Sequence, residues 1–207
     1  MEKVVIASRN QGKIAEISAI LAKYGMEAVS RDDAGVPPFE IEETGETYEE
    51  NSYLKAKAVM DITGTATLAD DSGLSVDTLS GAPGVFTARY AGENCTYYDN
   101  NVKLLGELRG VPMEERTATF VTVITMLFPD GTSIVARGEC PGRIAEALSG
   151  DRGFGYDPLF IPDGYDDTFA AMPVEVKNTV SHRARALMRL EELIVERERE
   201  TSGAKKE

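Results

Sequence analysis

The sequence contains a single histidine, His182, among its 207 residues, and this scarcity excludes several kinds of active site. One imidazole cannot form a zinc site with two histidine ligands, so the HExxH chemistry of zinc hydrolases is absent. A Ser-His-Asp triad would have to use His182, and no GxSxG motif surrounds any serine. If a divalent metal takes part in the chemistry, its ligands are therefore oxygen atoms, which favours Mg²⁺ or Mn²⁺.

Basic residues and long apolar runs are also scarce. There are 22 Lys and Arg residues against 35 Asp and Glu, a net charge of −13, which argues against binding to nucleic acid or to an anionic membrane. No apolar stretch approaches the roughly 20 residues that span a bilayer, and we expect no signal peptide before the first strand-like run. The two cysteines, Cys95 and Cys140, have no spacing typical of a metal site or a disulfide framework. We expect a soluble cytoplasmic protein whose partner is a small molecule.

The order of predicted elements indicates a mixed α/β fold. Residues 4–7 predict a buried strand, and Asn10 is a suitable N-cap for the helix that follows. A second helix is expected from Thr47, because Thr47 and Glu50 have capping-box spacing. Residues 117–128 and 133–136 predict a long hairpin, so the sheet should be mixed. A final helix is expected from Ser181. The residues of the second helix that are predicted to face inward are Leu54, Ala58 and Ile62. Those of the final helix are Ala184, Leu187, Met188, Ile194 and Val195.

The adjacent pair Asp70-Asp71 is the main candidate for chemistry. It follows the predicted buried strand 66–69 and precedes Ser72-Gly73. Two neighbouring carboxylates repel each other, and a fold tolerates them where a cation or a proton-transfer role compensates. A solvated turn is an alternative interpretation, because Asp, Ser and Gly are common in turns.

Four further segments contain candidate residues, each with a plainer structural explanation. Residues 8–13 form a polar turn before a helix, where backbone N–H groups bind phosphate. In an extended segment Glu40 and Glu42 would face one way and Glu43 the other, as metal ligands or as surface charge. The Gly-rich loop 150–158 could stack on a base or simply bury Phe154. Lys177, His182 and Arg183 lie near the start of the final helix, where His182 could equally be structural.

Six motifs occur in the order found in one known family. They are SRNQGK at 8–13, EETG at 42–45, ADDSGL at 69–74, GAPGVFTARYAG at 81–92, GFGYDPLF at 153–160, and Lys177 followed by SHRARAL at 181–187. With them the chain resembles the inosine triphosphate pyrophosphatases, over nearly its whole length. Two positions depart from the family pattern. Ser8 stands where threonine is frequent and keeps the hydroxyl, whereas Arg9 replaces a frequent glycine.

The resemblance implies a fold, a reaction and roles for residues. The fold would be one domain over residues 1–207, with an elongated mixed sheet, two lobes around a substrate cleft, a frayed charged tail at 196–207 and assembly as a homodimer. The reaction would be Mg²⁺-dependent hydrolysis of ITP, dITP or XTP to the monophosphate and pyrophosphate. Asp71 would be the general base and, with Glu42, a metal ligand. The substrate-binding residues would be Ser8, Arg9, Asn10, Gln11, Gly12, Lys13, Ser72, Phe154, Gly155, Tyr156, Asp157, Lys177, His182 and Arg183.

Other functions share these features. A pyrophosphatase with another base preference, like the Maf-like proteins, would differ in the triphosphates that it accepts. A phosphatase would release orthophosphate first, and a nucleotide sensor would bind without metal-dependent hydrolysis. The sequence leaves open the order of preference among ITP, XTP and dITP, the basis on which GTP is rejected, the choice among Glu40, Glu42 and Glu43, and the role of Asp70.

Overall fold

The first strand and helix form where the sequence predicts them. The structure, a computed structural model, describes residues 2–39 and 41–203, with side chains up to residue 200. Strand β1, Glu2–Ile6, leads through a polar turn into helix α1, Gln11–Lys23. Asn10 is the N-cap of α1, and its Oδ1 accepts hydrogen bonds from the backbone N–H groups of Gly12 (3.0 Å) and Lys13 (3.2 Å).

The strands form a mixed sheet, which confirms the predicted fold class. They hydrogen-bond in the order β2-β1-β3-β5-β6-β7, with β4 paired to β3. Strand β1 is parallel to β2 and β3, whereas β4 is antiparallel to β3 and β7 is antiparallel to β6. The bounds of the other strands are Met26–Ser30 (β2), Thr67–Val76 (β3), Pro83–Gly84 (β4), Thr117–Leu127 (β5), Ser133–Ile144 (β6) and Phe160–Pro162 (β7).

Within the described residues four more α-helices follow α1, and the cap of α2 confirms a local prediction. They are Tyr48–Thr63 (α2), Tyr97–Glu107 (α3), Val174–Val180 (α4) and His182–Gly203 (α5). Thr47 and Glu50 form the predicted capping box at the start of α2. Strand β2 and the short helix α4 were not predicted. No helix in the described part of the chain is long and apolar enough to cross a bilayer.

Some expected burial differs from the structure. The predicted inner face of α2 is wrong, because Ile62 is 49% exposed while Ala56 and Val59 are fully buried. Met188 on α5 is 54% exposed, although Leu187 and Ile194 are buried as predicted. Helix α5 runs to Gly203, so the helix includes most of the stretch expected to fray from residue 196. Residues 204–207 lie outside the described part.

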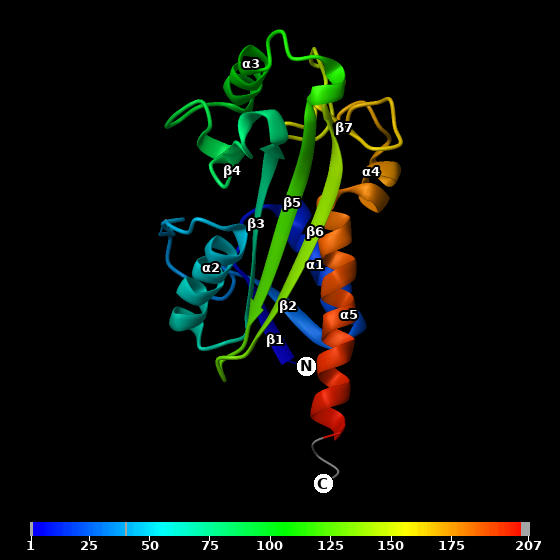
Figure 1. The fold of residues 1–207 in the computed structure, drawn as a ribbon. Coiled ribbons are helices and arrows are strands. Elements are labelled where there is room, and N and C mark those ends of the chain that lie inside the picture. The colour runs from blue at the N-terminus through cyan, green and yellow to red at the C-terminus, as the bar shows by residue number, and fades with distance from the viewer. Residues whose placement is uncertain (1, 40, 204–207) are drawn as a thin grey trace. The chain divides into compact units, whose positions relative to one another are not determined.

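The chain divides into two compact units. Unit 1 comprises residues 1–71, 123–137 and 186–207, and unit 2 comprises residues 72–122 and 138–185. In unit 1, helices α1 and α5 cover one face of the sheet and α2 covers the other (Figure 1). Alternate residues of the strands supply these two cores: Val4, Ile6 and Leu68 face α1 and α5, whereas Val5 and Ala69 face the α2 side.

Unit 2 has a separate core rich in aromatic residues. Phe120 of β5 packs edge-on against Phe160 of β7, with ring centroids 4.6 Å apart, and lies 6.0 Å from Phe169. Leu104 and Leu108, from α3 and its C-cap, join the same cluster. This core supports the Gly-rich loop that follows β6.

Candidate active site

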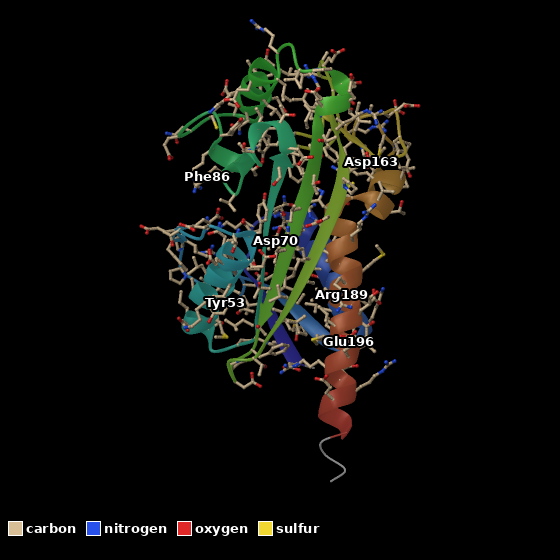
Figure 2. All side chains as sticks on the ribbon, in the orientation of Figure 1. Tyr53, Asp70, Phe86, Asp163, Arg189 and Glu196 are labelled. Carbon is tan, nitrogen blue, oxygen red and sulfur yellow. The ribbon has the colours of Figure 1, made fainter. Side chains whose placement is uncertain are left out.

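Asp70 and Asp71 lie within a strand. We expected them at a strand end or in a turn, but β3 continues from Thr67 to Val76 without interruption. Successive side chains of a strand point to opposite faces of the sheet. Asp70 therefore shares the face of Leu68 with α1, and Asp71 shares the face of Ala69 with α2. Figure 2 labels Asp70 in the middle of the strand.

Lys55 of α2 holds Asp71 in place. Its Nζ lies 2.7 Å from Asp71 Oδ1 and 3.0 Å from Glu43 Oε1. Burial raises the pKa of Asp71 above its ordinary value, Glu43 and Asp70 act in the same direction, and Lys55 opposes them. Burial alone would lower the pKa of Lys55, but Asp71 and Glu43 raise it overall, so the ammonium form is maintained. The result is a fixed carboxylate whose affinity for a proton exceeds that of an ordinary aspartate.

The second carboxylate oxygen of Asp71 has no hydrogen-bond partner. Oδ2 is buried and accepts no hydrogen bond, and the residue as a whole is only 7% exposed. An orphaned buried acceptor is costly, which indicates that a water molecule or a cation belongs there. Among residues 2–39 and 41–200 no three acidic, histidine or cysteine side chains surround a common point that could hold a metal. Mg²⁺ is compatible with such a site, because it is commonly held by one or two carboxylates together with substrate phosphates and water.

Lys13 of α1 pairs with Asp70, as Lys55 of α2 pairs with Asp71. Its Nζ forms an ion pair with Asp70 Oδ2 on the α1 side of β3. In the turn before α1, Ser8 Oγ accepts a hydrogen bond from the Asn10 backbone N–H at 3.2 Å. The backbone N–H groups of Gly12 and Lys13 already donate to Asn10 Oδ1. A ligand at this turn would therefore be contacted by its polar side chains. Arg9 and Gln11 are exposed, and Arg9 Nε lies 3.7 Å from Asp32.

Of the three neighbouring glutamates, the structure brings Glu43 to the cluster. Glu42, the predicted metal ligand, is exposed and forms no ion pair within the described residues, and Glu40 lies outside them. The segment is irregular rather than a strand, so strict alternation does not apply. Gly45 is held against α2, where its N–H donates to Asn51 Oδ1 at 2.8 Å. A Cβ at Gly45 would lie 2.7 Å from that oxygen, so glycine permits the approach that positions Glu43.

In unit 2, the loop 153–157 is fixed from several sides. Asp157 is 3% exposed, and its Oδ2 accepts hydrogen bonds from Phe154 N (2.8 Å) and Lys177 Nζ (2.6 Å). Tyr156 is also buried, and its hydroxyl donates to the Thr87 carbonyl at 2.9 Å. Gly153 has φ +75°, and a Cβ there would overlap Asp157 Oδ2. Asp157 and Tyr156 thus hold the loop, which leaves Phe154 as its half-exposed side chain.

Cationic side chains gather around Phe154. Lys177 Nζ lies 5.5 Å from the centroid of its ring, and the Arg183 guanidinium carbon lies at the same distance. His182 is buried and stacks on Phe120, with centroids 4.6 Å apart and ring planes 13° apart. Ser72, also in unit 2, shares a hydrogen bond of 2.8 Å with the hydroxyl of Thr122. Phe154, Lys177 and Arg183 therefore form the accessible part of this group.

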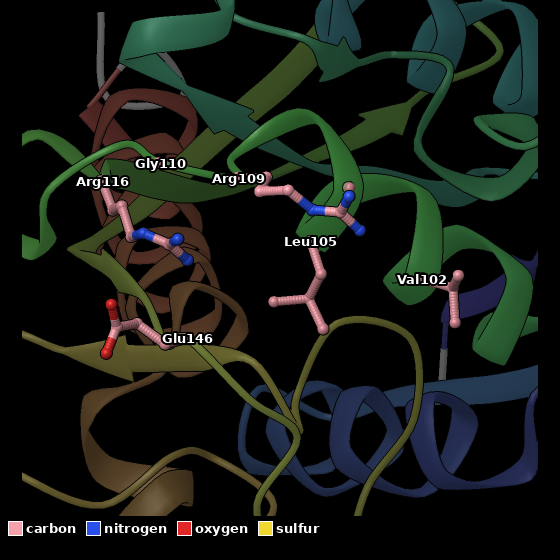
Figure 3. Close-up of a pocket in the computed structure, with 7 residues that line it drawn as sticks. Val102, Leu105, Arg109, Gly110, Arg116 and Glu146 are labelled. Atoms are coloured by element: carbon pink, nitrogen blue, oxygen red, sulfur yellow. The ribbon is translucent and has the colours of Figure 1, made fainter.

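A cavity of about 430 Å³ in unit 2 lies beside α3 and contains none of these residues. Figure 3 shows its lining, which includes Leu105, Arg109, Arg116 and Glu146. The Arg116 guanidinium donates to the carbonyls of Val111, Ala145 and Leu108 at 2.8–3.1 Å. This buried arginine thus ties together the chain around the end of α3, which is a structural role.

The sequence did not indicate Lys55 as a residue of the site, and the glutamate predicted as a metal ligand was Glu42 rather than Glu43. Lys55 lies in no motif that stood out, and its partners are 12 and 16 residues away. A signal was available nevertheless: Lys55 follows the polar residues Asn51 and Ser52 by four and three positions, which places it beside both of them on one side of a helix. Asn51 and Ser52 are buried.

Comparisons with known proteins agree with the predicted family. The family model described as Ham1 family matches residues 4–193. A protein of Geobacter sulfurreducens named dITP/XTP pyrophosphatase is 49% identical over 193 residues, covering 93% of this chain and 96% of its own. One of the same name from Clostridium perfringens is 46% identical over 198 residues, covering 93% and 97%. The structure of the Staphylococcus aureus Ham1 protein is 40% identical with a TM-score of 0.87, covering 95% of this chain and all of that one.

The family model extends over most of the residues, and the relatives align over nearly their full length. Each of the six motifs used for the sequence-based prediction lies within the matched range. This chain belongs to the Ham1 family.

Proposed function

We propose that this protein hydrolyses deaminated purine nucleoside triphosphates, such as dITP, XTP and ITP, to the monophosphate and pyrophosphate. The Geobacter sulfurreducens protein that carries the name dITP/XTP pyrophosphatase is 49% identical to the chain. The observation that carries the proposal is the buried Asp71, which Lys55 holds through one oxygen while the other has no partner. A carboxylate fixed in this way can accept a proton from water.

In unit 1, Asp71 acts as the general base. Its raised pKa makes it a stronger proton acceptor than an ordinary aspartate. Lys55 orients the carboxylate and limits the rise in its pKa. Lys13, together with the side chains of Ser8 and Asn10, binds the phosphates, whose negative charge must be offset before attack. No covalent intermediate is needed for this reaction.

Mg²⁺ is the proposed cofactor. Asp71 would hold it, with Glu43 as the second acid in place of Glu42, since Glu43 is the glutamate that contacts Lys55. When bound, the cation would neutralise phosphate charge and stabilise the departing pyrophosphate. The donor set is made of carboxylate oxygens only, which suits a hard cation.

In unit 2, the proposed role is recognition of the purine. Phe154 supplies an aromatic face, and Lys177, His182 and Arg183 supply hydrogen-bond donors. Deaminated purines carry a 6-oxo acceptor where adenine carries a 6-amino donor. A donor facing that position favours the oxo group and leaves the amino group unpaired, at a cost of roughly 1–3 kcal/mol. Ser72 is proposed to contact substrate, and Gly155, Tyr156 and Asp157 to shape the loop.

The remaining expectations belong to the same proposal. We propose that units 1 and 2 work as one domain on a single substrate, that the protein assembles as a homodimer, and that it works in the cytoplasm. An acidic chain with a net charge of −13 is consistent with a small-molecule substrate rather than nucleic acid or a membrane. Sedimentation equilibrium tests the dimer directly.

A panel of triphosphates tests the function. ITP, XTP, dITP, ATP and GTP are each incubated with the protein and Mg²⁺, and pyrophosphate and orthophosphate are measured separately. Rapid release of pyrophosphate from ITP, XTP and dITP, with slow turnover of ATP and GTP, supports the proposal. A preference for standard or pyrimidine nucleotides would indicate another pyrophosphatase, and orthophosphate as the first product would indicate a phosphatase. Tight ITP binding with no turnover would indicate a sensor.

A further inference from the structure

Tyr97 of α3 faces Phe154 of the Gly-rich loop, although neither ring belongs to a core. Their centroids lie 6.3 Å apart and their planes are inclined by 43°. Tyr97 is 58% exposed and Phe154 is 43% exposed. Large aromatic side chains normally bury most of their surface, so two neighbouring rings that both remain half exposed offer a binding surface for another flat, apolar group.

Helix α3 is also tied to this loop by a buried side chain. Asn101 lies one helical turn after Tyr97, so the two side chains share one face of α3. It is 3% exposed, and its Nδ2 donates to the Gly155 carbonyl at 2.9 Å. The bond fixes the loop, which carries Phe154, to the helix that carries Tyr97. The relative position of the two rings is therefore set by the fold and does not depend on their own weak contact.

The two rings must move slightly apart and become parallel before a planar base fits between them. A flat ring between two parallel aromatic rings needs a separation of about 7 Å, twice the van der Waals contact distance between carbon atoms. The observed 6.3 Å falls short of this by less than 1 Å. Tyr97 is the first residue of α3 and is mostly exposed, so its ring can turn towards parallel without disturbing a core.

We infer that Tyr97 and Phe154 form an aromatic slot that binds the purine from both sides, with Asn101 as the positioning residue for the slot. This inference rests on the proposed function, because it names a further residue that contacts the base of the same substrate. Every nucleobase has an aromatic face, so stacking contributes affinity without distinguishing a 6-oxo from a 6-amino group. Tyr97 thus raises affinity for the nucleoside, while base selectivity belongs to the hydrogen-bond donors.

Variants of two adjacent tyrosines test the slot. Tyr97→Ala is compared with Tyr97→Phe, which keeps the ring, and with Tyr98→Ala, which removes the neighbouring ring that is 64% exposed. The affinity for IMP is measured by calorimetry with Mg²⁺ present, and inhibition by pyrophosphate, which has no base, is measured in parallel. Tyr97→Ala should weaken IMP binding at least about fivefold, whereas Tyr97→Phe and Tyr98→Ala should leave it within about twofold. Pyrophosphate inhibition should be unchanged in all three, and the ratio of kcat/KM for ITP to that for ATP should stay constant.

The outcomes separate the slot from the proposed function. Wild-type affinity for IMP in Tyr97→Ala, or a loss as large in Tyr98→Ala, overturns the slot and leaves the hydrolase intact. Weaker nucleotide binding by Tyr97→Ala in a protein that releases no pyrophosphate keeps the slot and overturns the proposed reaction. A wild-type protein that binds neither IMP nor any triphosphate contradicts both.

Discussion

Asp70 and Asp71 are adjacent in sequence but lie on opposite faces of β3, and each contacts a different lysine. Asp70 pairs with Lys13 of α1, and Asp71 pairs with Lys55 of α2. The strand therefore separates two carboxylates that would otherwise repel each other in a partly buried site. The two carboxylates therefore differ in their surroundings: Asp71 keeps one oxygen without a hydrogen-bond partner, and Asp70 pairs with the lysine next to the proposed phosphate-binding turn.

Replacing Asp71 by asparagine should nearly abolish turnover while preserving binding. The amide keeps the shape of the side chain but cannot accept a proton from water, so kcat for dITP should fall by about 10²- to 10⁴-fold. Calorimetry with a slowly hydrolysed ITP analogue should give a dissociation constant within a few-fold of wild type. Asp61→Asn is the control, because Asp61 is exposed on α2 and pairs only with Lys57 within the described residues. Normal turnover in Asp71→Asn would remove this residue as the base.

Replacing Lys55 by methionine should shift the pH dependence of the reaction. Lys55 lowers the pKa of Asp71, so its loss allows burial, Glu43 and Asp70 to raise that pKa further. Protonated Asp71 is inactive as a base, and the acidic limb of the profile of kcat/KM against pH should therefore move to higher pH. The loss of activity relative to wild type should be largest at the acidic end of the profile. Lys57→Met, two residues along α2 and exposed to solvent, should give a wild-type profile. An unchanged acidic limb in Lys55→Met would show that Lys55 does not control Asp71.

Two glycines of the unit 2 loop should respond differently to alanine. Both have positive φ, +75° at Gly153 and +60° at Gly155. A Cβ at Gly153 would overlap the carboxylate of Asp157, whereas a Cβ at Gly155 meets nothing within 4 Å. Gly153→Ala should therefore displace Asp157 from Phe154 N and Lys177, and raise KM for dITP much more than Gly155→Ala. Equal effects of the two variants would mean that backbone strain alone is responsible.

The two thiols should differ in reactivity. Burial raises the pKa of Cys140 to about 11, so only about one part in a thousand is thiolate at pH 8. Cys95 is partly exposed. With a chromogenic disulfide reagent at pH 8, the native protein should show one reactive thiol, and the protein in guanidinium chloride should show two. Native Cys95→Ser should show none. Rapid reaction of both thiols in the native protein would contradict the burial of Cys140.

Local signals in the sequence predicted much of unit 1. The Asn10 cap and the Thr47–Glu50 capping box involve residues two or three positions apart, so both are visible without the fold. The hairpin of β5 and β6 was predicted from its β-branched composition and its Pro129-Asp130-Gly131 turn, although β6 extends further, to Ile144.

Predictions failed where the deciding partner is distant in sequence. The apolar residues of α2 suggested the wrong inner face because the buried positions Asn51 and Ser52 are polar. Ser52 is satisfied by the Thr125 hydroxyl, 2.7 Å away but 73 residues along the chain. For the same reason the sequence could not show which of Glu42 and Glu43 lies near Asp71. Only the contact between Glu43 and Lys55 in the folded chain distinguishes the two. The continuity of β3 through a polar Asp-Asp-Ser-Gly sequence likewise depends on neighbouring strands.

Hydrolysis of dITP in ¹⁸O-labelled water tests the central claim most directly, since it reports which bond breaks and where the water attacks. With Mg²⁺ and wild-type protein, we predict one labelled oxygen in dIMP and unlabelled pyrophosphate, and no comparable product from Asp71→Asn. Label in orthophosphate released as the first product, or equal turnover by the Asp71→Asn variant, would contradict the account of Asp71 as the base of a pyrophosphohydrolase.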